Sequence, residues 1–276
     1  MSNPKIQSLA PVCLAWKRRV MLEAQGLFKY YGSVPAILNV NFCIGPGQVL
    51  GYLGPNGSGK STTVKLLTGL LQPTRGQVMF SGKNIHDNLP AYRKQIGYVP
   101  EEANLYGYMT GEEYLDMVGT FRGMPRNLMD WRIDNLLELL SLGPHRSVPM
   151  GSLSKGMRQK ILLIASLMDD PELLVFDEPL SGLDAVSALV FRNLIQGLKA
   201  KKKAIFYCSH VLEVVEKVCT GLLILRKGEV IAHGTIDNVR GQIGQSTVED
   251  IFLQVASDKD VSQVANDIVD VITEKR

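Results

Sequence analysis

The sequence predicts an α/β protein with a mainly parallel sheet, an antiparallel β region and a helical insert. Over most of the 276 residues, short apolar runs with a strand-like pattern alternate with segments of helical periodicity. That alternation is typical of parallel strands joined by crossover helices. Between residues 103 and 150 no strand pattern interrupts the helical one. Residues 22–53 instead have the pattern of successive strands with tight turns, as expected of antiparallel pairing.

Each predicted strand is a short apolar or alternating run that ends at a turn signal. Residues 38–44 carry apolar side chains two apart, and a Gly-Pro-Gly turn follows at 45–47. Two apolar runs on either side of Lys227-Gly228 predict a hairpin. The other predicted strands cover residues 48–53, 76–80, 96–99, 173–176 and 204–208.

Helices are predicted where apolar residues recur at three- and four-residue spacing. The clearest lies at residues 130–142, where the leucines form one broad apolar side. Either Ser152 or Ser154 is expected to cap the helix that begins near residue 153. The other predicted helices cover residues 61–71, 112–121, 153–168, 186–198 and 211–218, with further helix after residue 237.

These patterns divide the chain into three parts. Residues 1–20 form an N-terminal extension, because a cleaner start of the folded pattern lies at Met21. Residues 21–236 form the main domain, which is long enough to bury a sizeable core and contains a helical subdomain at about 103–165. Residues 237–276 form a helical C-terminal extension.

Composition excludes several classes of protein. Lysine and arginine (30) nearly balance aspartate and glutamate (27), so the net charge of +3 gives no indication of nucleic-acid binding. No apolar run of about 18 residues is present to span a bilayer, and the first twenty residues lack a secretory pattern. The four cysteines contain no Cys-x-x-Cys pair, which favours reduced thiols in a cytosolic compartment.

A phosphate-binding loop is the most specific feature of the sequence. The spacing Gly-x-x-x-x-Gly-Lys-Ser begins at Gly54, directly after an apolar strand and directly before a helix. Its glycines let the backbone wrap around phosphate oxygens, and the helix presents its positive N-terminal end to them. Lys60 is expected at the β- and γ-phosphates, and Ser61 at a Mg²⁺ ion that bridges them. The predicted ATP-binding residues here are Gly54, Pro55, Asn56, Gly57, Ser58, Gly59, Lys60, Ser61 and Thr62.

Two adjacent carboxylates, Asp177 and Glu178, end another apolar strand. Side chains alternate along a strand, so the two point in different directions. Asp177 is expected to hold Mg²⁺, and Glu178 to orient or deprotonate the attacking water. Two acids at a strand end are also common as solvated loop residues. Downstream of a phosphate loop, however, the pair predicts a P-loop NTPase core that binds and hydrolyses ATP.

From about residue 22 to 236, with a weaker tail to about 253, the chain resembles the ATP-binding domains of ABC transporters. The resemblance rests on the phosphate loop, the acidic pair and three more segments in the family's order. These are Leu153-Ser154-Lys155-Gly156-Met157, Ser181-Gly182-Leu183-Asp184 and Ser209-His210. It implies a head-to-tail dimer, in which each domain helps to enclose the nucleotide of the other.

The first of these segments looks like the family signature, which is implied to cap the ATP held by the other domain. Ser154, Gly156 and the helix N-terminus that they begin would suit a γ-phosphate. Lys155 and Met157 stand where glycine and glutamine are commonest in the family. Lys155 is expected to add positive charge near the partner's nucleotide. By itself, Leu-Ser-x-Gly is also a routine helix cap.

The resemblance assigns roles to three further residues. Asp184 lies in a loop that is implied to meet the partner subunit, and it is also expected to cap the following helix. His210 matches the family's switch histidine, which would reach the γ-phosphate or the water beside Glu178, although a histidine after a strand is often structural. Tyr31 matches the aromatic residue that stacks on adenine, with the adjacent Tyr30 as the alternative.

One further departure from the family concerns Glu101. It follows Pro100 where the family usually has a glutamine that touches Mg²⁺ and water. A carboxylate can ligate Mg²⁺, but it adds negative charge near the phosphates. Together with the signature and the Val-Glu-Asp-Ile-Phe segment at 248–252, Glu101 looks like a mark of one branch of the family. In that branch the ATPase is a separate chain, and its permease partners often export.

The resemblance therefore implies the ATPase subunit of an ABC transporter, with ATP and Mg²⁺ as cofactors. Its expected partners are an integral membrane permease and a second ATP-binding subunit, identical or different, with no nucleic acid. The subunit would be peripheral at the cytoplasmic face of the membrane, held there by the permease. Residues 104–119 carry apolar and aromatic side chains that are expected to dock on the permease, unless they anchor the loop on the helical insert.

Three alternatives have less support. Soluble ABC-type ATPases of translation or DNA repair usually carry two ATPase domains or a long coiled coil, and this chain has one set of motifs and no heptad run. A GTPase switch would need an Asn-Lys-x-Asp segment and would leave the signature unexplained. A non-catalytic nucleotide-binding scaffold is disfavoured because Glu178 and His210 are both present.

Overall fold

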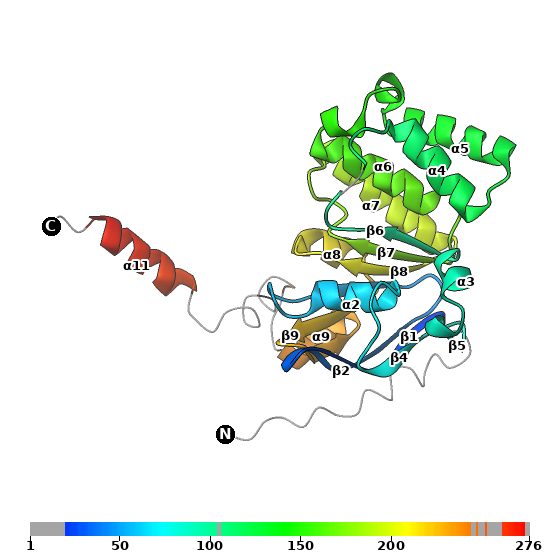
Figure 1. Cartoon of the computed structure of the whole chain (residues 1–276). Coiled ribbons are helices and arrows are strands. Elements are labelled where there is room, and N and C mark those ends of the chain that lie inside the picture. Colours follow the sequence, from blue (N-terminus) through cyan, green and yellow to red (C-terminus); the bar gives the residue numbers. More distant parts are fainter. Residues whose placement is uncertain (1–19, 104–105, 244–246, 248–251, 253–260, 274–276) are drawn as a thin grey trace.

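Two β-sheets and a group of helices make up the protein in the computed structural model (Figure 1). The structure describes residues 20–103, 106–243, 247, 252 and 261–273. The predicted N-terminal extension and the start of the predicted docking segment lie almost entirely outside these ranges. Helix α11, Val261–Thr273, stands away from the two sheets in Figure 1.

The central layer is a six-stranded sheet in the order β10-β9-β3-β8-β7-β6. Every neighbouring pair is parallel except β9 and β10, which form an antiparallel hairpin. Nearly all of its central residues are buried, as expected when helices or a second sheet cover both faces. Its strands are β3 Val49–Leu53, β6 Ile96–Val99, β7 Leu173–Asp177, β8 Ala204–Cys208, β9 Gly221–Arg226 and β10 Glu229–Gly234.

Other parts of the chain form hydrogen bonds at or beside both edges of this sheet. Strand β6 has four residues, and the guanidinium of Arg122 donates a hydrogen bond to the carbonyl of Ile96 at 3.0 Å. At the other edge, next to β10, the turn at Gly228 accepts a hydrogen bond from the Leu38 amide at 2.8 Å. This second contact joins the central sheet to the second sheet.

The second sheet is antiparallel, in the order β2-β1-β4-β5. One buried core lies between it, helix α2 and one face of the central sheet. Three of the aromatic rings in that core lie together, with Tyr52 and Phe206 at 4.9 Å between centroids and Phe42 at 5.7 Å from Phe206. The strands are β1 Leu22–Tyr31, β2 Val34–Ile44, β4 Arg75–Phe80 and β5 Lys83–Asn84.

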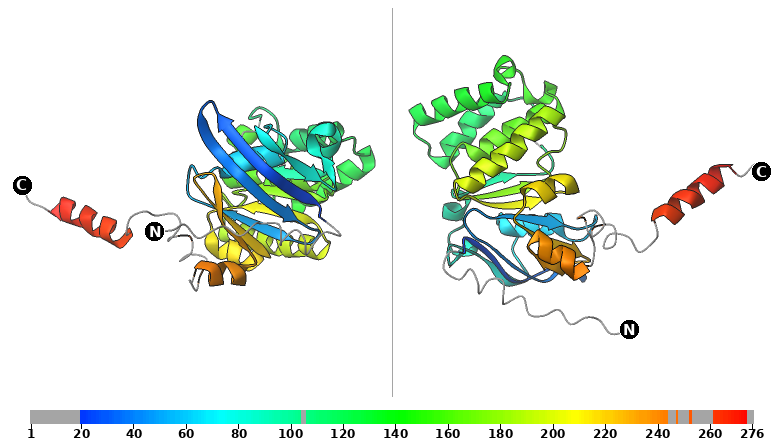
Figure 2. Two further views of the ribbon diagram at one scale, coloured as in Figure 1. Left: turned by 90° about the horizontal axis from the view of Figure 1, so that it is seen from below. Right: turned by 180° about the vertical axis from the view of Figure 1, so that it is seen from behind.

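Helices α6, α7, α8 and α9 contribute to a second core on the opposite face of the central sheet. Figure 2 shows α7, α8 and α9 toward the viewer when the molecule is seen from behind. The helices are α2 Lys60–Leu67, α3 Leu89–Arg93, α4 Gly111–Arg122, α5 Arg126–Leu139, α6 Lys155–Leu167, α7 Ala185–Ala200, α8 Leu212–Val218 and α9 Ile236–Ile243.

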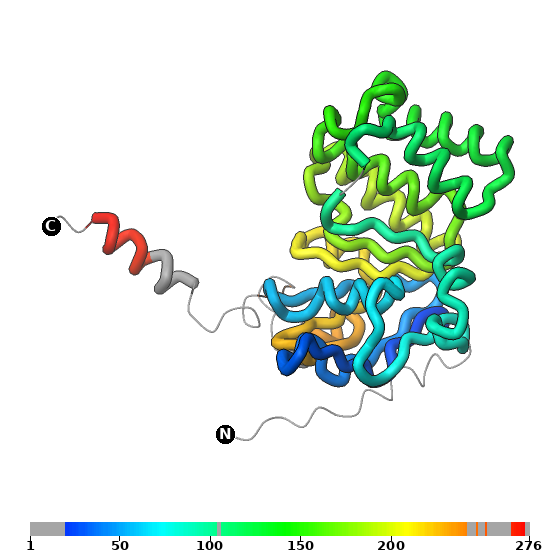
Figure 3. Tube along the Cα trace, in the orientation of Figure 1, coloured from blue at the N-terminus to red at the C-terminus, as the bar shows by residue number. Residues whose placement is uncertain are grey.

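Helices α4, α5 and α6 enclose a third core, formed by residues between Met109 and Met168. Figure 3 shows the chain leaving the central sheet after β6 and returning to it at β7, so that these helices form one continuous excursion. The side chain of Thr110 accepts a hydrogen bond from the Glu113 amide, and the Glu113 carboxylate accepts one from the Thr110 amide. This capping box fixes the start of α4.

The predicted α/β fold with a mainly parallel sheet, an antiparallel β region and a helical insert is confirmed. Three helices differ most from the prediction. Helix α2 ends at Leu67, before Gly69 at φ 68°, and not at residue 71. Helix α5 begins four residues and ends three residues before the predicted bounds, at Arg126 and Leu139, and α3 was not predicted. The division into domains at residues 21 and 236 stays a prediction.

Two expectations from composition concern described residues. Cys43, Cys208 and Cys219 are buried and form no disulfide bond, while Cys13 lies outside the described residues. Among the residues that the structure describes, no helix is long and apolar enough to cross a membrane.

Candidate functional site

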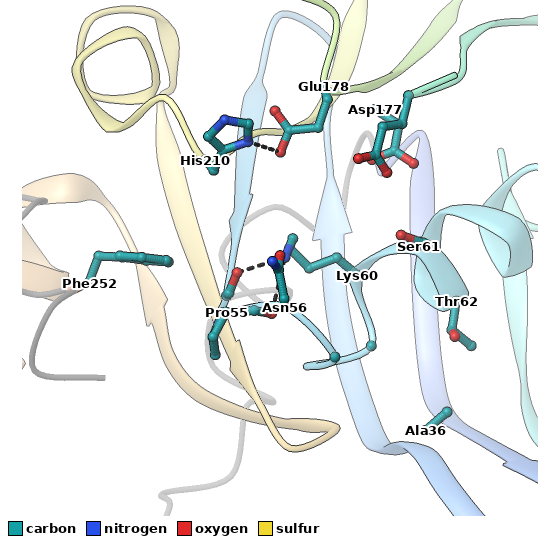
Figure 4. Close-up of a pocket in the computed structure, with 14 residues that line it drawn as sticks. Ala36, Pro55, Asn56, Lys60, Ser61, Thr62, Asp177, Glu178, His210 and Phe252 are labelled. Atoms are coloured by element: carbon teal, nitrogen blue, oxygen red, sulfur yellow. Dashed lines mark hydrogen bonds and ion pairs between the residues drawn. The ribbon is translucent and has the colours of Figure 1, made fainter. Parts of the chain in front are cut away.

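A pocket of about 660 Å³ lies at the carboxyl ends of β3, β6, β7 and β8 (Figure 4). Parallel strands place their carboxyl ends at one edge of a sheet, so loops that are far apart in sequence meet there. The residues that line the pocket are Ala36, Gly54, Pro55, Asn56, Gly57, Gly59, Lys60, Ser61, Thr62, Glu101, Asp177, Glu178, His210 and Phe252.

The floor of the pocket is the predicted phosphate loop. Gly59, at φ 109°, precedes α2, and a Cβ atom placed on it would lie 2.5 Å from the carbonyl oxygen of Ala36. Only glycine therefore fits between the loop and β2. The Lys60 ammonium donates hydrogen bonds to the carbonyl oxygens of Gly54 at 2.7 Å and Pro55 at 3.1 Å. This places a cation at the mouth of the loop, directly at the start of α2.

These features fit a bound triphosphate. The N-terminus of α2, the backbone N–H groups of the loop and the Lys60 ammonium all favour a polyanion. Ser61 and Thr62 lie on the first turn of α2 and also line the pocket.

Opposite the loop, three carboxylates gather in the pocket, from Glu101, Asp177 and Glu178. Asp177 is buried, and burial, followed by the charges of Glu101 and Glu178, raises its pKa to about 6. A hydrogen bond with the Cys208 side chain and, to a smaller extent, the charge of Lys60 oppose that rise in pKa. Because like charges disfavour one another in a buried site, a cation bound here would relieve the repulsion.

The same carboxylates are candidate ligands for magnesium. Within the described part of the chain, no group of three or more His, Cys, Asp or Glu side chains is arranged to hold a metal ion. At phosphate sites, however, Mg²⁺ takes only one or two protein oxygens and completes its shell with phosphate oxygens and water. The Ser61 hydroxyl and the Asp177 carboxylate face the same space in Figure 4, which meets that requirement.

Glu178 is held on both carboxylate oxygens. Its Oε1 lies 2.8 Å from Nδ1 of His210, and its Oε2 accepts a hydrogen bond from the Ser209 hydroxyl at 3.2 Å. The side chain is buried, whereas that of His210 is 71% exposed. The Glu178 backbone is left-handed, at φ 48°, which is uncommon for a residue other than glycine. The backbone turn thus aims this carboxylate into the pocket beside a solvent-facing imidazole.

Seven of the predicted site residues lie outside the lining of the pocket. Tyr31 ends β1, is 49% exposed, and has the Lys29 ammonium 5.7 Å from its ring centroid. Asp184 caps α7, with its carboxylate accepting hydrogen bonds from the amide and hydroxyl of Ser187, and its pKa is lowered chiefly by the first of these. The signature residues are at the exposed N-terminus of α6, and they are Ser154, Lys155, Gly156 and Met157.

Of the two serines expected to cap α6, Ser154 does so, with its hydroxyl accepting a hydrogen bond from the Met157 amide at 3.2 Å. The Lys155 side chain is directed to its own chain, where it contacts Ser181. Ser58 belongs to the phosphate loop but is buried beneath it, outside the lining.

The structure adds three residues that the sequence did not single out for this site. Ala36 reaches the loop from β2, Ser209 holds Glu178, and Phe252 lines the pocket at the end away from Ala36 in Figure 4. Ser209 precedes the predicted histidine and was the easiest to find. Phe252 ends the segment at 248–252 that drew attention in the sequence, but the rest of that segment lies outside the described residues.

The arrangement can carry out phosphoanhydride hydrolysis. The loop and Lys60 are arranged to hold a triphosphate, and Mg²⁺, when bound, would neutralise charge on the phosphate oxygens. Glu178, aimed at the space above the loop, is placed to accept a proton from an attacking water molecule. His210 can hold that carboxylate or the water in position.

Comparison with known proteins agrees with this chemistry. The ABC transporter family model matches residues 37–181. The ABC-type transporter ATP-binding protein EcsA of Bacillus subtilis is 31% identical over 240 residues, which cover 86% of this chain and 97% of that protein. The Nod factor export ATP-binding protein I of Ralstonia nicotianae is 34% identical, over 83% of this chain and 72% of that one.

An uncharacterised ABC transporter ATP-binding protein of Nostoc is 37% identical over 76% of this chain. The chain spans only 62% of the length of that relative. A solved structure of the ATP-binding subunit of an ABC transporter is 31% identical, with a TM-score of 0.81 over 85% of this chain and 99% of the other. The chain therefore belongs to the ABC transporter family, as an ATP-binding and ATP-hydrolysing subunit.

Proposed function

We propose that this subunit uses Mg²⁺–ATP hydrolysis to drive export through a separate membrane permease, at whose cytoplasmic side it is bound. The observation that carries the ATPase part is the pocket, which brings the phosphate loop, Asp177, Glu178 and His210 together. The resemblance of Glu101 and the signature to one branch of the family supports a separate permease. The name of the Nod factor relative supports export.

Within the pocket, we assign Lys60 to the β- and γ-phosphates, Ser61 and Asp177 to Mg²⁺, and Glu178 to the attacking water. Glu101 is a second candidate ligand of Mg²⁺, because its carboxylate shares the pocket with Asp177. Tyr31 is assigned to adenine, since its ring is half exposed at the end of β1, one strand away from Ala36. Stacking there would hold the base without selecting it strongly.

The subunit works as a head-to-tail dimer, homomeric or heteromeric, in this proposal. Two exposed features support a partner that docks near the pocket. The signature residues lie at an exposed helix N-terminus, and Asp184 is exposed at the start of α7. Beside Asp184, the apolar side chains of Val186, Leu189 and Val190 are 46–73% exposed. In the dimer, Ser154 and Gly156 of one subunit would face the γ-phosphate held by the other.

A patch formed by Tyr106 and Tyr108 is the proposed docking surface for the permease. The two side chains are 53% and 79% exposed, and their rings lie 6.0 Å apart between centroids. Exposed aromatic residues of this kind are enriched at protein interfaces. Asn104 and Leu105, which the sequence predicted as part of this surface, lie outside the described residues.

The proposal is tested by purifying the tagged full-length chain from membranes and identifying what accompanies it. A multi-spanning permease is expected, and the Tyr106→Ala/Tyr108→Ala variant should lose it while keeping the ATPase activity of the isolated chain. Trp131→Ala is a matched control, because Trp131 is 62% exposed on α5 but lies outside the patch. Recovery of ribosomes or DNA in place of a permease would refute the transport function.

A further inference from the structure

The N-terminus of α6 is attached to the loop at residues 179–184 of the same chain. The Lys155 ammonium donates a hydrogen bond to the Ser181 hydroxyl at 2.6 Å. The side-chain amide of Gln159, which is buried, donates one to the carbonyl of Pro179 at 3.2 Å. The signature helix and the loop that follows Glu178 are thus connected by side chains from two successive turns of α6.

The backbones of the two segments are also in direct contact. A Cβ atom placed on Gly156 would lie 2.4 Å from the carbonyl oxygen of Gly182, so only glycine permits this approach. A Cβ atom placed on Gly182 would lie 2.9 Å from Cγ and 3.1 Å from Cδ of Lys155. The alkyl stem of Lys155 therefore lies across Gly182, and its ammonium reaches Ser181 from there.

The loop is in turn connected to the backbone of Glu178, whose carboxylate lies in the pocket. The Ser181 amide donates a hydrogen bond to the Glu178 carbonyl at 3.1 Å, and the Glu178 amide donates one to the Cys208 carbonyl at 2.9 Å. A continuous series of contacts runs from Lys155 through Ser181 to the backbone of Glu178. If the signature acts on the nucleotide of a partner, Lys155 is therefore connected both to the partner's nucleotide site and to the pocket of its own chain.

We propose that Lys155 is a positioning residue that holds the signature helix and the residue 179–184 loop together, so that both move as one body. The proposal rests on the dimer of the proposed function for its effect on hydrolysis, but the attachment itself belongs to a single chain. The Lys155 ammonium contacts the loop of its own chain. Through Ser181 it connects the signature, which would act at the partner's site, to Glu178 at the subunit's own site.

The attachment is tested first in the nucleotide-free full-length chain, by amide hydrogen exchange. Lys155→Met keeps the alkyl stem over Gly182 and removes the donor, while Ser181→Ala removes the acceptor. Either substitution should speed exchange at residues 155–160 and 180–184 by about three- to tenfold, as expected for loss of one hydrogen bond. The double variant should exchange no faster than either single variant, because both remove the same contact.

Lys201→Met is the matched control for exchange, since it removes an exposed lysine at the far end of α7, about 24 Å along the helix from Asp184. It should leave exchange in both segments unchanged. Additive effects in the double variant, or a change confined to residues 155–160, would show that Lys155 and Ser181 do not act together, and the proposal would be wrong.

The second measurement is steady-state hydrolysis against ATP concentration, made on the complex with the permease. Lys155→Met and Ser181→Ala should each lower kcat by about three- to tenfold and bring the Hill coefficient toward one. The ATP dissociation constant of each isolated variant should stay unchanged, and Lys155→Arg should restore kcat because it also donates to Ser181.

The outcomes separate this proposal from the function on which it rests. A lower kcat in Lys155→Met with an unaltered Ser181→Ala would mean that the ammonium acts on the partner's nucleotide, which would overturn the positioning role. If exchange is coupled in the single chain but no dimer or permease complex is found, the attachment is supported and the proposed function is wrong.

Discussion

In the proposed function, Glu178 is the residue on which hydrolysis depends most directly. We predict that Glu178→Gln lowers the rate of phosphate release by about 100-fold or more, because the amide cannot accept the proton of the attacking water. ATP binding should remain, since the loop and Lys60 are unchanged. Phosphate release and nucleotide affinity measured on the same preparation check both parts. Lys60→Ala is the contrasting variant, and it should lose affinity for ATP; turnover in Glu178→Gln at the wild-type rate would remove the assigned role.

At Asp177, burial and neighbouring carboxylates make the charged form unfavourable. Its folded-state pKa, about 6, lies above the ordinary value of 3.8. The folded state therefore binds the proton more tightly, and stability falls as pH rises from about 4 to about 6. Above pH 6 the full cost is present, on the order of 1–3 kcal/mol.

From this we predict that Asp177→Asn raises the free energy of unfolding at pH 7.5 in the absence of Mg²⁺ and nucleotide. Urea titrations of both proteins at pH 5 and pH 7.5 measure it, and the gain should be larger at pH 7.5. The same variant should lose the dependence of ATP binding on Mg²⁺. A variant that is less stable than the wild type at pH 7.5 would show that the Asp177 charge does not destabilise the folded state.

Among the elements, the start of α4 depends on a local capping arrangement. Thr110→Ala removes the side-chain acceptor of the Glu113 amide, and we predict a loss of about 1 kcal/mol in the free energy of unfolding. Thr120→Ala is the control, because Thr120 is exposed near the end of the same helix. Denaturant titrations compare the two variants, and an equal loss from both would mean that the cap contributes nothing specific.

The start of α6 depends on a close backbone approach. In Gly156→Ala the new methyl group would meet the Gly182 carbonyl, so the signature or the loop must shift. We predict a fall in ATPase activity of about ten- to a hundredfold, since small displacements at a reacting site have effects of that size. Gly197→Ala on α7 is the control, because a Cβ atom there has no neighbour within 4 Å; this variant should keep full activity.

The elements also show where sequence patterns predict well. Strands such as β6, β7 and β8 were predicted to within a residue, because fully buried strands are short apolar runs that stop at a turn or a charged residue. Helix α5 was placed four residues late because its first turn, after Pro125, has little apolar periodicity. The five-residue helix α3 has too few turns to produce a helical pattern at all.

For the whole molecule, the dimer is the property that can be tested on the purified subunit. We predict that Glu178→Gln with Mg²⁺ and ATP elutes with twice the mass of the monomer, because ATP bound to the loop would be retained and would join the two subunits. Light scattering after size exclusion measures this. Omitting Mg²⁺, or adding the Lys60→Ala change, should leave monomer, and a monomer under all conditions would contradict the head-to-tail arrangement.

At the same scale, the sequence predicted the pocket through motifs, each of which ends a strand. Residues 54–62, Glu101, the acidic pair and His210 come together because β3, β6, β7 and β8 are parallel and adjacent. Contacts between distant segments were not visible in the pattern. Ala36 reaches the loop from the other sheet, and the direction of the Lys155 side chain depends on how α6 packs against Gly182.

The short edge at β6 has a consequence for aggregation of the protein. An unpaired strand edge is a template on which a second chain can add, which leads to aggregation. Here the edge strand has four residues and ends before Pro100, and the Arg122 guanidinium donates a hydrogen bond to the Ile96 carbonyl. Such an edge offers few free backbone groups with which a strand of a second chain could pair. This edge of the central sheet is therefore a poor site for the addition of a second chain.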